Sequence, residues 1–479
     1  MRADPADHRD GTVAVIGGGV SGLVAARDLA RAGARVVLVE EGDRLGGRVR
    51  GETVDGVAVD IGAEAFATRG GAVAALLAEL GLADEIVRPA PLGSWVVTGT
   101  GAVPLPAAGA IGIPAAPLSR DAVRALGPVG ALRAAAEPML PRHLGRGGSL
   151  AELVRARLGP RVLARLVRPV VLGVHSADPS DMTVADVPGL AAALERSGSL
   201  LAAGRELRDS RAAAGGAVAG LRGGMGALVA ALAAELDRAG VVVRTGVAAG
   251  RLEAERDGRG RRVWAVTGAR GEPLVRADAV ILAVSEAAAR RLLGAPPAAP
   301  SGRVEVVALV VDDPRLDSAP RGTGALVAES ASGIAAKALT HATAKWPDRA
   351  RLFGPGRHLI RLSYGRLGSA PATGGLGDEA ALRLAVRDAS RILGIELGEA
   401  SVRHMIRREW EAGNARQGDP AAGDALEAPP GVVFAGDWVS GTGLASVIPG
   451  ARAAAEEAAR TTIDSDGATV PHREGAQQR

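Results

Sequence analysis

The chain has no cysteine among its 479 residues. Disulfide bonds, a thiolate nucleophile, an iron–sulfur cluster and a cysteinyl link to a prosthetic group are therefore excluded. Lysine occurs only twice, as Lys337 and Lys345, and aromatic residues make up 2% of the chain. The 57 basic and 53 acidic residues are interspersed and leave a net charge of +4. This near balance, together with so few aromatic residues, argues against a nucleic-acid partner.

Long apolar runs are also missing. No stretch offers about 18 apolar residues free of charge, so no transmembrane span is predicted. The N-terminal sequence MRADPADHRDG lacks the apolar core of a signal peptide, which favours a cytoplasmic protein. The seven histidines show no metal-ligand spacing, so no metal site is expected. The hydrophobic content of 47% is ordinary for a folded protein, and the length predicts two or three lobes.

The most informative pattern that is present lies at residues 12–48. An apolar run is followed by Gly17-x-Gly19-x-x-Gly22, an amphipathic stretch and a second apolar run that ends on Glu40. This order is the strand–turn–helix–strand fingerprint of a dinucleotide site. The glycines let the backbone approach a pyrophosphate, the helix N-terminus attracts its charge, and Glu40 is placed to hold a ribose diol. A glycine turn between an ordinary strand and helix is the alternative interpretation.

A second glycine motif, Gly46-Gly47-Arg48, follows Glu40 after one short loop. In this position it resembles the second glycine signature of the FAD-binding flavoprotein oxidases, which include amine oxidases and phytoene desaturases. The glycine pair allows the backbone to pass close to a ligand, and Arg48 can face the pyrophosphate or the flavin end. A basic surface turn is the alternative.

The sequence patterns divide the chain into a discontinuous nucleotide-binding domain, an inserted sheet domain, a helical lobe and a tail. The nucleotide-binding domain is predicted at 12–80, 216–300 and 425–465. The inserted substrate-binding domain, a mixed sheet, is predicted at 81–114 and 301–424, and the helical lobe at 115–215. Residues 464–479 are polar and predicted to be disordered.

Both lysines lie in one short run, AKALTHATAKW. If residues 336–346 form a strand, its period of two puts five side chains on one face. They are Lys337, Leu339, His341, Thr343 and Lys345. Nearby RLSYGR adds Arg361, Tyr364 and Arg366. This face would be a cationic wall for carboxylates. The alternative is a solvated edge whose charges prevent aggregation.

An ordered set of motifs identifies a narrower resemblance. The set includes DIGAEAFATRGGAVAALLAELGLADEIVRPA at 60–90, RPVVLGVHSADPSDMTVADVPGL at 168–190, GLRGGMGALVAALAAEL at 220–236, and AKALTHATAKW. Over most of residues 12–460 the chain resembles the oxygen-dependent protoporphyrinogen and coproporphyrinogen oxidases, which are FAD enzymes of haem synthesis. The resemblance implies an α/β, amine-oxidase-like flavoprotein fold, in which a Rossmann-like FAD-binding domain carries an inserted mixed-sheet substrate domain and a helical lobe.

The resemblance also implies the chemistry. A porphyrinogen loses six hydrogens to become a porphyrin, so three two-electron rounds send hydride to non-covalently bound FAD, and O2 reoxidises the flavin to give H2O2. The cofactor carries this chemistry, so no catalytic acid or base is assigned.

Individual roles follow from the resemblance by position. FAD contacts are implied for Gly17, Gly19, Gly22, Glu40, Gly46, Gly47, Arg48, Val247, Gly436, Asp437, Thr442, Gly443 and Leu444. Gly173 is expected to orient the substrate by pointing its carbonyl at the pyrrole N–H groups. The substrate propionates are expected to meet Lys337, His341, Lys345, Tyr364 and Arg366. Asp60 and Glu64 of the DIGAE loop are expected to be structural.

Four functions are compatible with these residues. Coproporphyrinogen III oxidation to coproporphyrin III is favoured, because a cationic pocket suits four propionates better than two. Protoporphyrinogen IX oxidase is the first alternative, and another amine-oxidase-like or desaturase-like flavoprotein is the second. A non-catalytic FAD-binding partner is the third, because the polar segment at 410–433 is shorter than in relatives. A contact with a ferrochelatase, which would receive the product, stays open.

Overall fold

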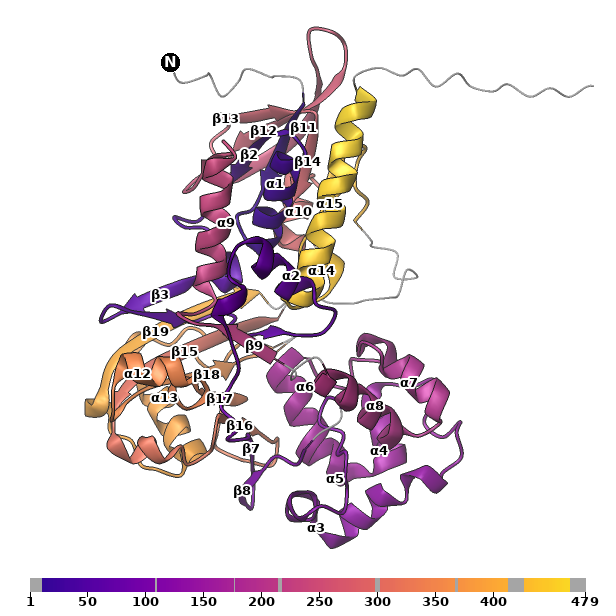
Figure 1. The fold of residues 1–479 in the computed structure, drawn as a ribbon, viewed down its shortest axis with the longest axis vertical. Helices are drawn as coiled ribbons and strands as arrows, with labels where there is room; N and C mark the ends of the chain where they lie inside the picture. The colour runs from indigo at the N-terminus through magenta and orange to yellow at the C-terminus, as the bar shows by residue number, and fades with distance from the viewer. Residues whose placement is uncertain are drawn as a thin grey trace, which may run out of the picture.

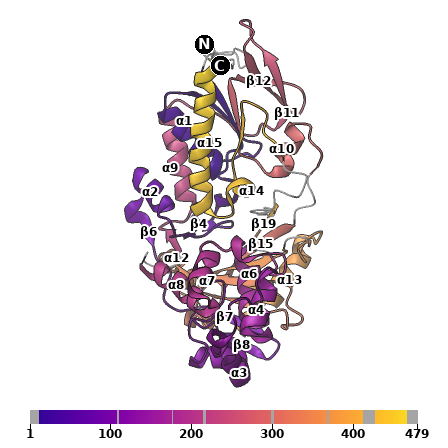
Figure 2. The same ribbon diagram turned by 90° about the vertical axis from the view of Figure 1, so that its right-hand side faces the viewer.

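The computed structural model describes residues 11–107, 110–175, 177–213, 218–297, 302–366, 369–411 and 426–465. The molecule is elongated (Figure 1). A parallel sheet with its helices forms one end, and a mixed sheet and a helical lobe lie side by side at the other (Figures 1 and 2).

The parallel sheet has five strands in the order β10-β2-β1-β14-β20. They are β1 (Thr12–Ile16), β2 (Arg35–Val39), β10 (Val242–Arg244), β14 (Ala279–Leu282) and β20 (Val432–Phe434). Their central strands are apolar runs because both faces are covered. One face packs on α1 (Val20–Arg31), α9 (Gly226–Arg238) and α15 (Leu444–Ser465), and the other on the sheet of β11 (Ala249–Arg256), β12 (Arg262–Gly268) and β13 (Pro273–Ala277). The apolar runs expected to be strands here are confirmed.

The mixed sheet has seven strands in the order β19-β15-β18-β17-β16-β7-β8. They are β7 (Trp95–Thr98), β8 (Gly101–Pro104), β15 (Arg303–Asp312), β16 (Gly324–Val327), β17 (Ala338–His341), β18 (Arg357–Tyr364) and β19 (Val402–Glu411). One face packs on α13 (Asp378–Leu393), and we name it the α13 face. The opposite face meets the hairpin of β3 (Gly51–Val54) and β4 (Val57–Asp60) and the loop at residues 61–64, and we name it the loop face.

The prediction of one strand over 336–346 is wrong beyond His341. Strand β17 covers only Ala338–His341, and α11 (Ala342–Lys345) follows it directly. Pro347 then begins α12 (Pro347–Phe353), which is a position that suits proline because no helical N–H is lost there. Lys345 therefore does not lie on a strand face with Lys337.

A buried ion pair organises the helical lobe. Glu137 of η3 (Glu137–Met139) accepts a hydrogen bond of 2.6 Å from Arg157 Nε of α4 (Leu150–Leu158). The same carboxylate accepts the backbone N–H groups of Leu200 and Leu201 at the start of α8 (Leu200–Ala213). Both charged side chains are at most 1% exposed. The lobe also contains α3 (Arg120–Ala135), α6 (Arg168–His175) and α7 (Leu190–Ser197).

Two expectations concern the edges of the described residues. Helix α15 continues to Ser465, so the first two residues of the predicted tail 464–479 are helical, and the rest lie outside the described residues. In the short segment 410–433, residues 412–425 lie outside them as well. In the part of the chain that the structure describes, no helix is both long enough and apolar enough to cross a bilayer.

Candidate functional site

The glycine turn between β1 and α1 leaves room for a ligand on one side only. A Cβ on Gly22 would lie 1.9 Å from the carbonyl oxygen of Gly17, so the turn packs against the helix. A Cβ on Gly19 would meet nothing within 4 Å. Gly19 is also the N-cap residue of α1, and no side chain caps the N–H groups of this helix end. The first turn of α1 therefore presents uncapped N–H groups beside open space, which suits a pyrophosphate.

Three further predicted segments surround this turn. The carboxylate of Glu40 accepts hydrogen bonds from the backbone N–H of Gly18 (2.6 Å) and of Gly42 (2.7 Å). Gly46 donates its N–H to the carbonyl of Gly18 at 2.8 Å, and Val247 donates its N–H to the carbonyl of Glu40 at 3.0 Å. The end of β2, the Gly46–Gly47 loop and the segment after β10 thus meet at the glycine turn.

Arg48 connects this region to the C-terminal part of the chain. Its guanidinium forms an ion pair with Asp437 and donates to the carbonyl of Glu411, the last residue of β19. Asp437 follows Gly436 and begins α14 (Asp437–Ser440). Thr442 and Gly443 are exposed, and Leu444 starts α15. The residues expected to contact FAD, which are widely separated in sequence, therefore come together. An open helix N-terminus, an acid and an arginine fit a dinucleotide cofactor.

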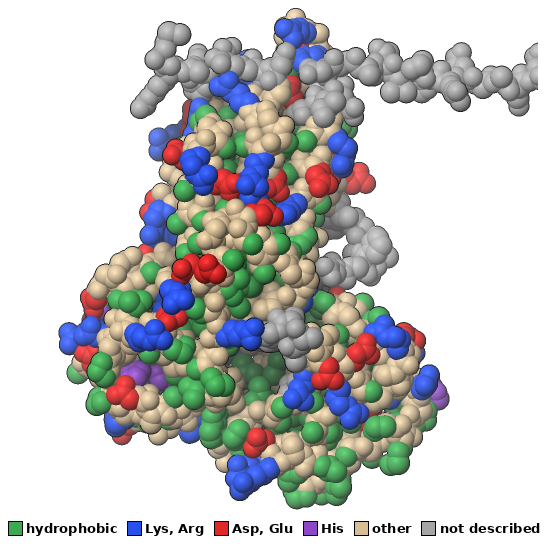
Figure 3. Space-filling model, in the orientation of Figure 1, with side chains coloured by type: hydrophobic (Ala, Val, Ile, Leu, Met, Phe, Trp, Pro, Cys, Tyr) green, Lys and Arg blue, Asp and Glu red, His purple; other side chains and the backbone are tan. Residues whose placement is uncertain are grey.

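Gly173 lies where the helical lobe meets the loop face. A Cβ on Gly173 would come within 2.5 Å of Leu326 Cδ2 and 3.9 Å of Ala338 Cβ, so α6 packs closely on β16 and β17. Figure 3 shows the surface hollowed, with hydrophobic side chains in the hollow, where the helical lobe adjoins the rest of the molecule. Lys337 forms a bend immediately before β17 and is partly buried. Burial lowers the pKa of Lys337 to about 8.

Lys345 has a different partner from the one expected. Its Nζ lies 2.6 Å from Glu64 Oε1, and Arg361 Nη1 lies 2.7 Å from the other oxygen, Glu64 Oε2. Burial opposes ionisation, but Lys345 and Arg361 outweigh it and lower the pKa of Glu64 to about 2. The carboxylate is thus ionised at neutral pH, and the charge of Lys345 is balanced inside the protein.

Tyr364 faces the core rather than a pocket. It lies opposite Glu305 in the sheet, is 0% exposed and packs with Ala385 and Ala389 of α13. Its role as a substrate contact is therefore not supported, because the α13 face is closed. Arg366 follows the same strand and is exposed. Strand periodicity indicated which residues share a face, but not which face turns toward the cofactor.

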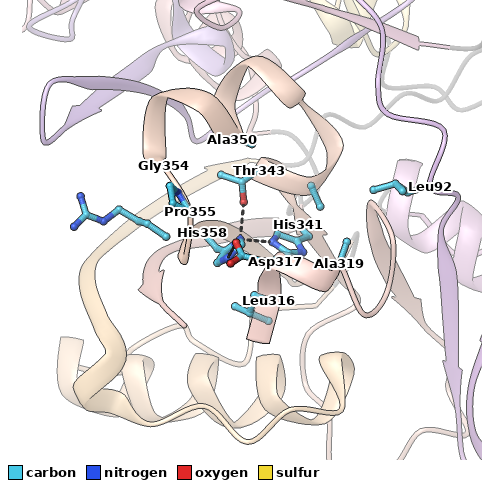
Figure 4. Close-up of a pocket in the computed structure, with 12 residues that line it drawn as sticks. Leu92, Leu316, Asp317, Ala319, His341, Thr343, Ala350, Gly354, Pro355 and His358 are labelled. Carbon is cyan, nitrogen blue, oxygen red and sulfur yellow. Dashed lines mark hydrogen bonds and ion pairs between the residues drawn. The ribbon is translucent and has the colours of Figure 1, made fainter. Parts of the chain in front are cut away.

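His341 also lies on the α13 face, at its edge. Its Nε2 lies 3.0 Å from His358 Nδ1, and His358 Nε2 lies 3.2 Å from Asp317 Oδ1. Figure 4 shows the two imidazoles pointing toward each other beside a cavity of about 190 Å³. Leu92, Leu316 and Pro355 are among its lining residues. His341 is 1% exposed and is committed to this pair, so it does not join Lys337 in a cationic wall.

Arg361, which the sequence added to the cationic wall without a substrate contact of its own, is the central side chain of the loop face. Arg361 is 8% exposed, and its Nη2 donates to the backbone carbonyls of Ile61 and Gly62. Asp60, at the start of this loop, pairs with Arg349 of α12 and accepts the N–H of Met225 at 3.0 Å. The structural role expected for Asp60 is consistent with these contacts. The loop carbonyls that Arg361 binds lie about 300 positions away in the sequence, so no local pattern could reveal these contacts.

The family of the chain is identified by a comparison with known protein families. The sequence profile of the flavin containing amine oxidoreductases matches residues 20–463. The chain belongs to this family. The glycine motifs predicted a flavoprotein oxidoreductase, and this prediction is confirmed. The chain is a flavin-dependent oxidoreductase.

Relatives narrow the similarity within the family. A protein named coproporphyrinogen III oxidase from Mycobacterium tuberculosis (strain ATCC 25618 / H37Rv) is 33% identical, over 95% of this chain and 98% of the relative. The protoporphyrinogen oxidase of Homo sapiens is 31% identical, over 61% of this chain and 63% of the human protein. The resemblance to these two oxidases that the ordered motifs predicted is confirmed.

Solved structures show the same fold. A crystal structure from Exiguobacterium sp. 255-15 matches with a TM-score of 0.79 at 22% identity, over 95% of this chain and 100% of that chain. Cyclohexylamine oxidase from Brevibacterium oxydans matches with a TM-score of 0.61 at 17% identity, over 96% and 100%. The predicted amine-oxidase-like flavoprotein fold is confirmed.

Proposed function

We propose that this protein binds FAD non-covalently and oxidises coproporphyrinogen III to coproporphyrin III, with O2 as acceptor and H2O2 as by-product. The observation that carries the proposal is the 33% identity to a coproporphyrinogen III oxidase, which spans 95% of the chain and therefore includes every part of the site. The absence of cysteine supports a non-covalent cofactor, since it removes the cysteinyl link.

The residues of the chain bind and orient rather than transfer protons. The first turn of α1 and Gly19 offer N–H groups and space to the pyrophosphate, and Glu40 is placed for the ribose. FAD, when bound, supplies the two-electron acceptor for each of the three rounds. Gly173 offers a backbone carbonyl to the pyrrole N–H groups, and a side chain at this position would have to displace the tip of Leu326.

The propionates are assigned to Lys337 and Arg366. Arg366 is exposed, and Lys337 immediately precedes Ala338, whose Cβ would lie 3.9 Å from a Cβ on Gly173. Lys345 is left out because Glu64 balances it, and His341 and Tyr364 are left out because they face α13. The remaining cations are fewer than the sequence predicted.

This shortage of cations favours one alternative, protoporphyrinogen IX oxidase, whose substrate has two propionates and not four. The similarity to the human protoporphyrinogen oxidase also supports it, although over a smaller share of the chain.

Steady-state oxidation with both substrates separates the two functions. Purified protein loaded with FAD is given coproporphyrinogen III or protoporphyrinogen IX in air, and porphyrin fluorescence, O2 uptake and H2O2 are recorded. We expect faster porphyrin formation from coproporphyrinogen III, with one H2O2 formed for each O2 consumed. A higher kcat/KM for protoporphyrinogen IX would establish the alternative, and no porphyrin from either substrate would overturn both.

A further inference from the structure

The carboxylate of Glu64 is one of the points at which the mixed sheet is joined to the loop at residues 61–64; Arg361 also donates to the carbonyls of Ile61 and Gly62. Lys345 of α11 and Arg361 of β18 each bind one of its oxygens, at 2.6 and 2.7 Å. The side chains of Glu64, Lys345 and Arg361 are 13%, 19% and 9% exposed. In such a sheltered place an ion pair is screened little, so the three groups hold one another in a fixed geometry.

The loop that carries Glu64 also touches the Gly46-Gly47-Arg48 motif. Ala63 donates its N–H to the carbonyl of Arg48 at 2.8 Å. Gly62 passes so close that a Cβ there would lie 1.9 Å from the same carbonyl oxygen. From Arg48 the contacts continue to Asp437 through an ion pair, and from Gly46 to the carbonyl of Gly18 in the glycine turn. A continuous path of contacts therefore runs from the mixed sheet to the residues assigned to FAD.

We infer that Glu64 is a positioning residue that holds the Arg48 loop in the shape that binds FAD. The inference rests on the FAD binding proposed above. Glu64 acts through the backbone of Gly62 and Ala63, and its two cations anchor that backbone to the mixed sheet. Its loss removes the side-chain tether at the end of the loop, while Arg361 still holds the carbonyls of Ile61 and Gly62. The weakened anchoring lowers the affinity for FAD although Glu64 has no assigned contact with the cofactor.

Two effects of losing Glu64 must be separated. Glu64→Gln leaves Lys345 and Arg361 buried without their counter-charge, which destabilises the fold in general. The double variant Glu64→Gln with Lys345→Met removes one of the two unbalanced charges, while methionine keeps a long apolar side chain beside Trp346. Stability is expected to recover in the double variant, but the tether that Glu64 provides is still missing, so FAD affinity is not expected to recover.

A matched control lies on the other face of the same sheet. Glu305 is a buried glutamate that pairs with Arg407 at 2.7 Å, and Arg407 also donates to the carbonyls of Thr373 and Leu376 ahead of α13. Its exposure is 3%, so breaking this pair is at least as damaging to the sheet. Glu305 lies on the α13 face and reaches the Arg48 loop only indirectly, along β19 from Arg407 to Glu411, whose carbonyl accepts from Arg48. Glu305→Gln should lower stability and leave FAD affinity unchanged.

The experiment titrates deflavinated protein with FAD and follows quenching of flavin fluorescence, with the unfolding temperature of each variant measured in parallel. We expect about tenfold weaker FAD binding in Glu64→Gln and in the double variant, and a change of less than about twofold in Glu305→Gln. Recovery of FAD affinity together with stability in the double variant would overturn the inference, as would equal losses in Glu64→Gln and Glu305→Gln. If the wild-type protein binds no FAD, the proposed function falls as well; if it binds FAD and Glu64→Gln binds it equally, only this inference falls.

Discussion

The parallel sheet and the mixed sheet differ in which atoms form their sites. At the ends of β1 and β2 the strands are apolar, and the groups that we propose to face FAD are backbone N–H groups with one acid, Glu40. The mixed sheet instead buries charged side chains on both faces, with Arg361 on one and Glu305 on the other. A backbone site can be encoded in one short motif, whereas a side-chain site requires partners from distant segments.

The largest expected effect comes from adding one methyl group to the glycine turn of the parallel sheet. Gly22→Ala places a Cβ 1.9 Å from the carbonyl oxygen of Gly17, so the backbone must move. We expect a loss of about 3 kcal/mol in unfolding free energy and no retained flavin. Chemical denaturation and the visible absorption of the purified protein measure the two outcomes.

Gly19→Ala is the matched control for that change. Its Cβ would meet nothing within 4 Å, and Gly19 has an ordinary negative φ of −68°, so stability should stay unchanged. The methyl group would enter the space assigned to the pyrophosphate, so FAD binding alone should weaken. Unchanged FAD binding by Gly19→Ala would contradict the placement of the cofactor beside α1.

Acid should destabilise the mixed sheet through His341. Burial, and then the neighbouring His358, lower the pKa of His341 to about 4, against an ordinary value of 6.5. The unfolded chain therefore binds a proton that the folded chain does not between these two pH values, and stability falls as the pH drops through this window. The pKa difference corresponds to about 3 kcal/mol at most. The negative charge of Asp317, which pairs with His358, raises the pKa of His341 and is already included in this value.

Unfolding free energy measured from pH 7 to pH 4 in wild type and in His341→Gln checks this effect. The variant removes the titrating ring, so its curve should be flatter in this window, whatever its stability at pH 7. Parallel curves for the two proteins would show that the imidazole pair does not control the acid limb.

Smaller effects are expected at Tyr364, the last residue of β18, and at Arg366 just after it, and the two residues should differ in what they change. Tyr364→Phe removes a buried hydroxyl near Asp388 that has no hydrogen-bond partner among the described residues, so stability should change by less than about 1 kcal/mol, with KM unchanged. Arg366→Gln removes an exposed charge and should raise KM for coproporphyrinogen III by about fivefold with the unfolding temperature unchanged. An altered KM in Tyr364→Phe, or an altered unfolding temperature in Arg366→Gln, would reverse the assignment of the two faces.

The smallest effect is expected where the mixed sheet meets the hairpin of β3 and β4 through a partly exposed pair. Arg408 of β19 donates to Glu52 of β3 at 2.7 Å, and Arg408 is 41% exposed. Arg408→Gln should cost less than about 1 kcal/mol, and the loss should shrink further in high salt, because solvent and ions screen the pair. Denaturation at low and high salt measures it, and a salt-independent loss above that size would mean that this contact is structurally central.

The sequence was sufficient for the parallel sheet and its glycine turn. Its strands are apolar runs, and the acid and glycines stand at the spacings that a dinucleotide requires, so β1, α1, β2 and Glu40 could be predicted from local pattern. The clustering of Arg48 with Asp437 followed from the family resemblance, since nothing local relates them.

Prediction was weaker for the mixed sheet. The alternating run at 336–346 contains alanine and threonine, which are compatible with both strand and helix, and only tertiary contacts end β17 at His341. Glu64 forms ion pairs with Lys345 and Arg361. These contacts depend on how a loop from one part of the chain packs on a sheet from another part.

The most direct test of the account is the reaction of the flavin with substrate in the absence of O2. FAD-loaded protein is mixed anaerobically with coproporphyrinogen III, and the visible flavin absorption is followed before air is admitted. The account predicts bleaching, then recovery of the flavin spectrum with porphyrin fluorescence once O2 enters. Bound FAD that stays yellow with coproporphyrinogen III would contradict it.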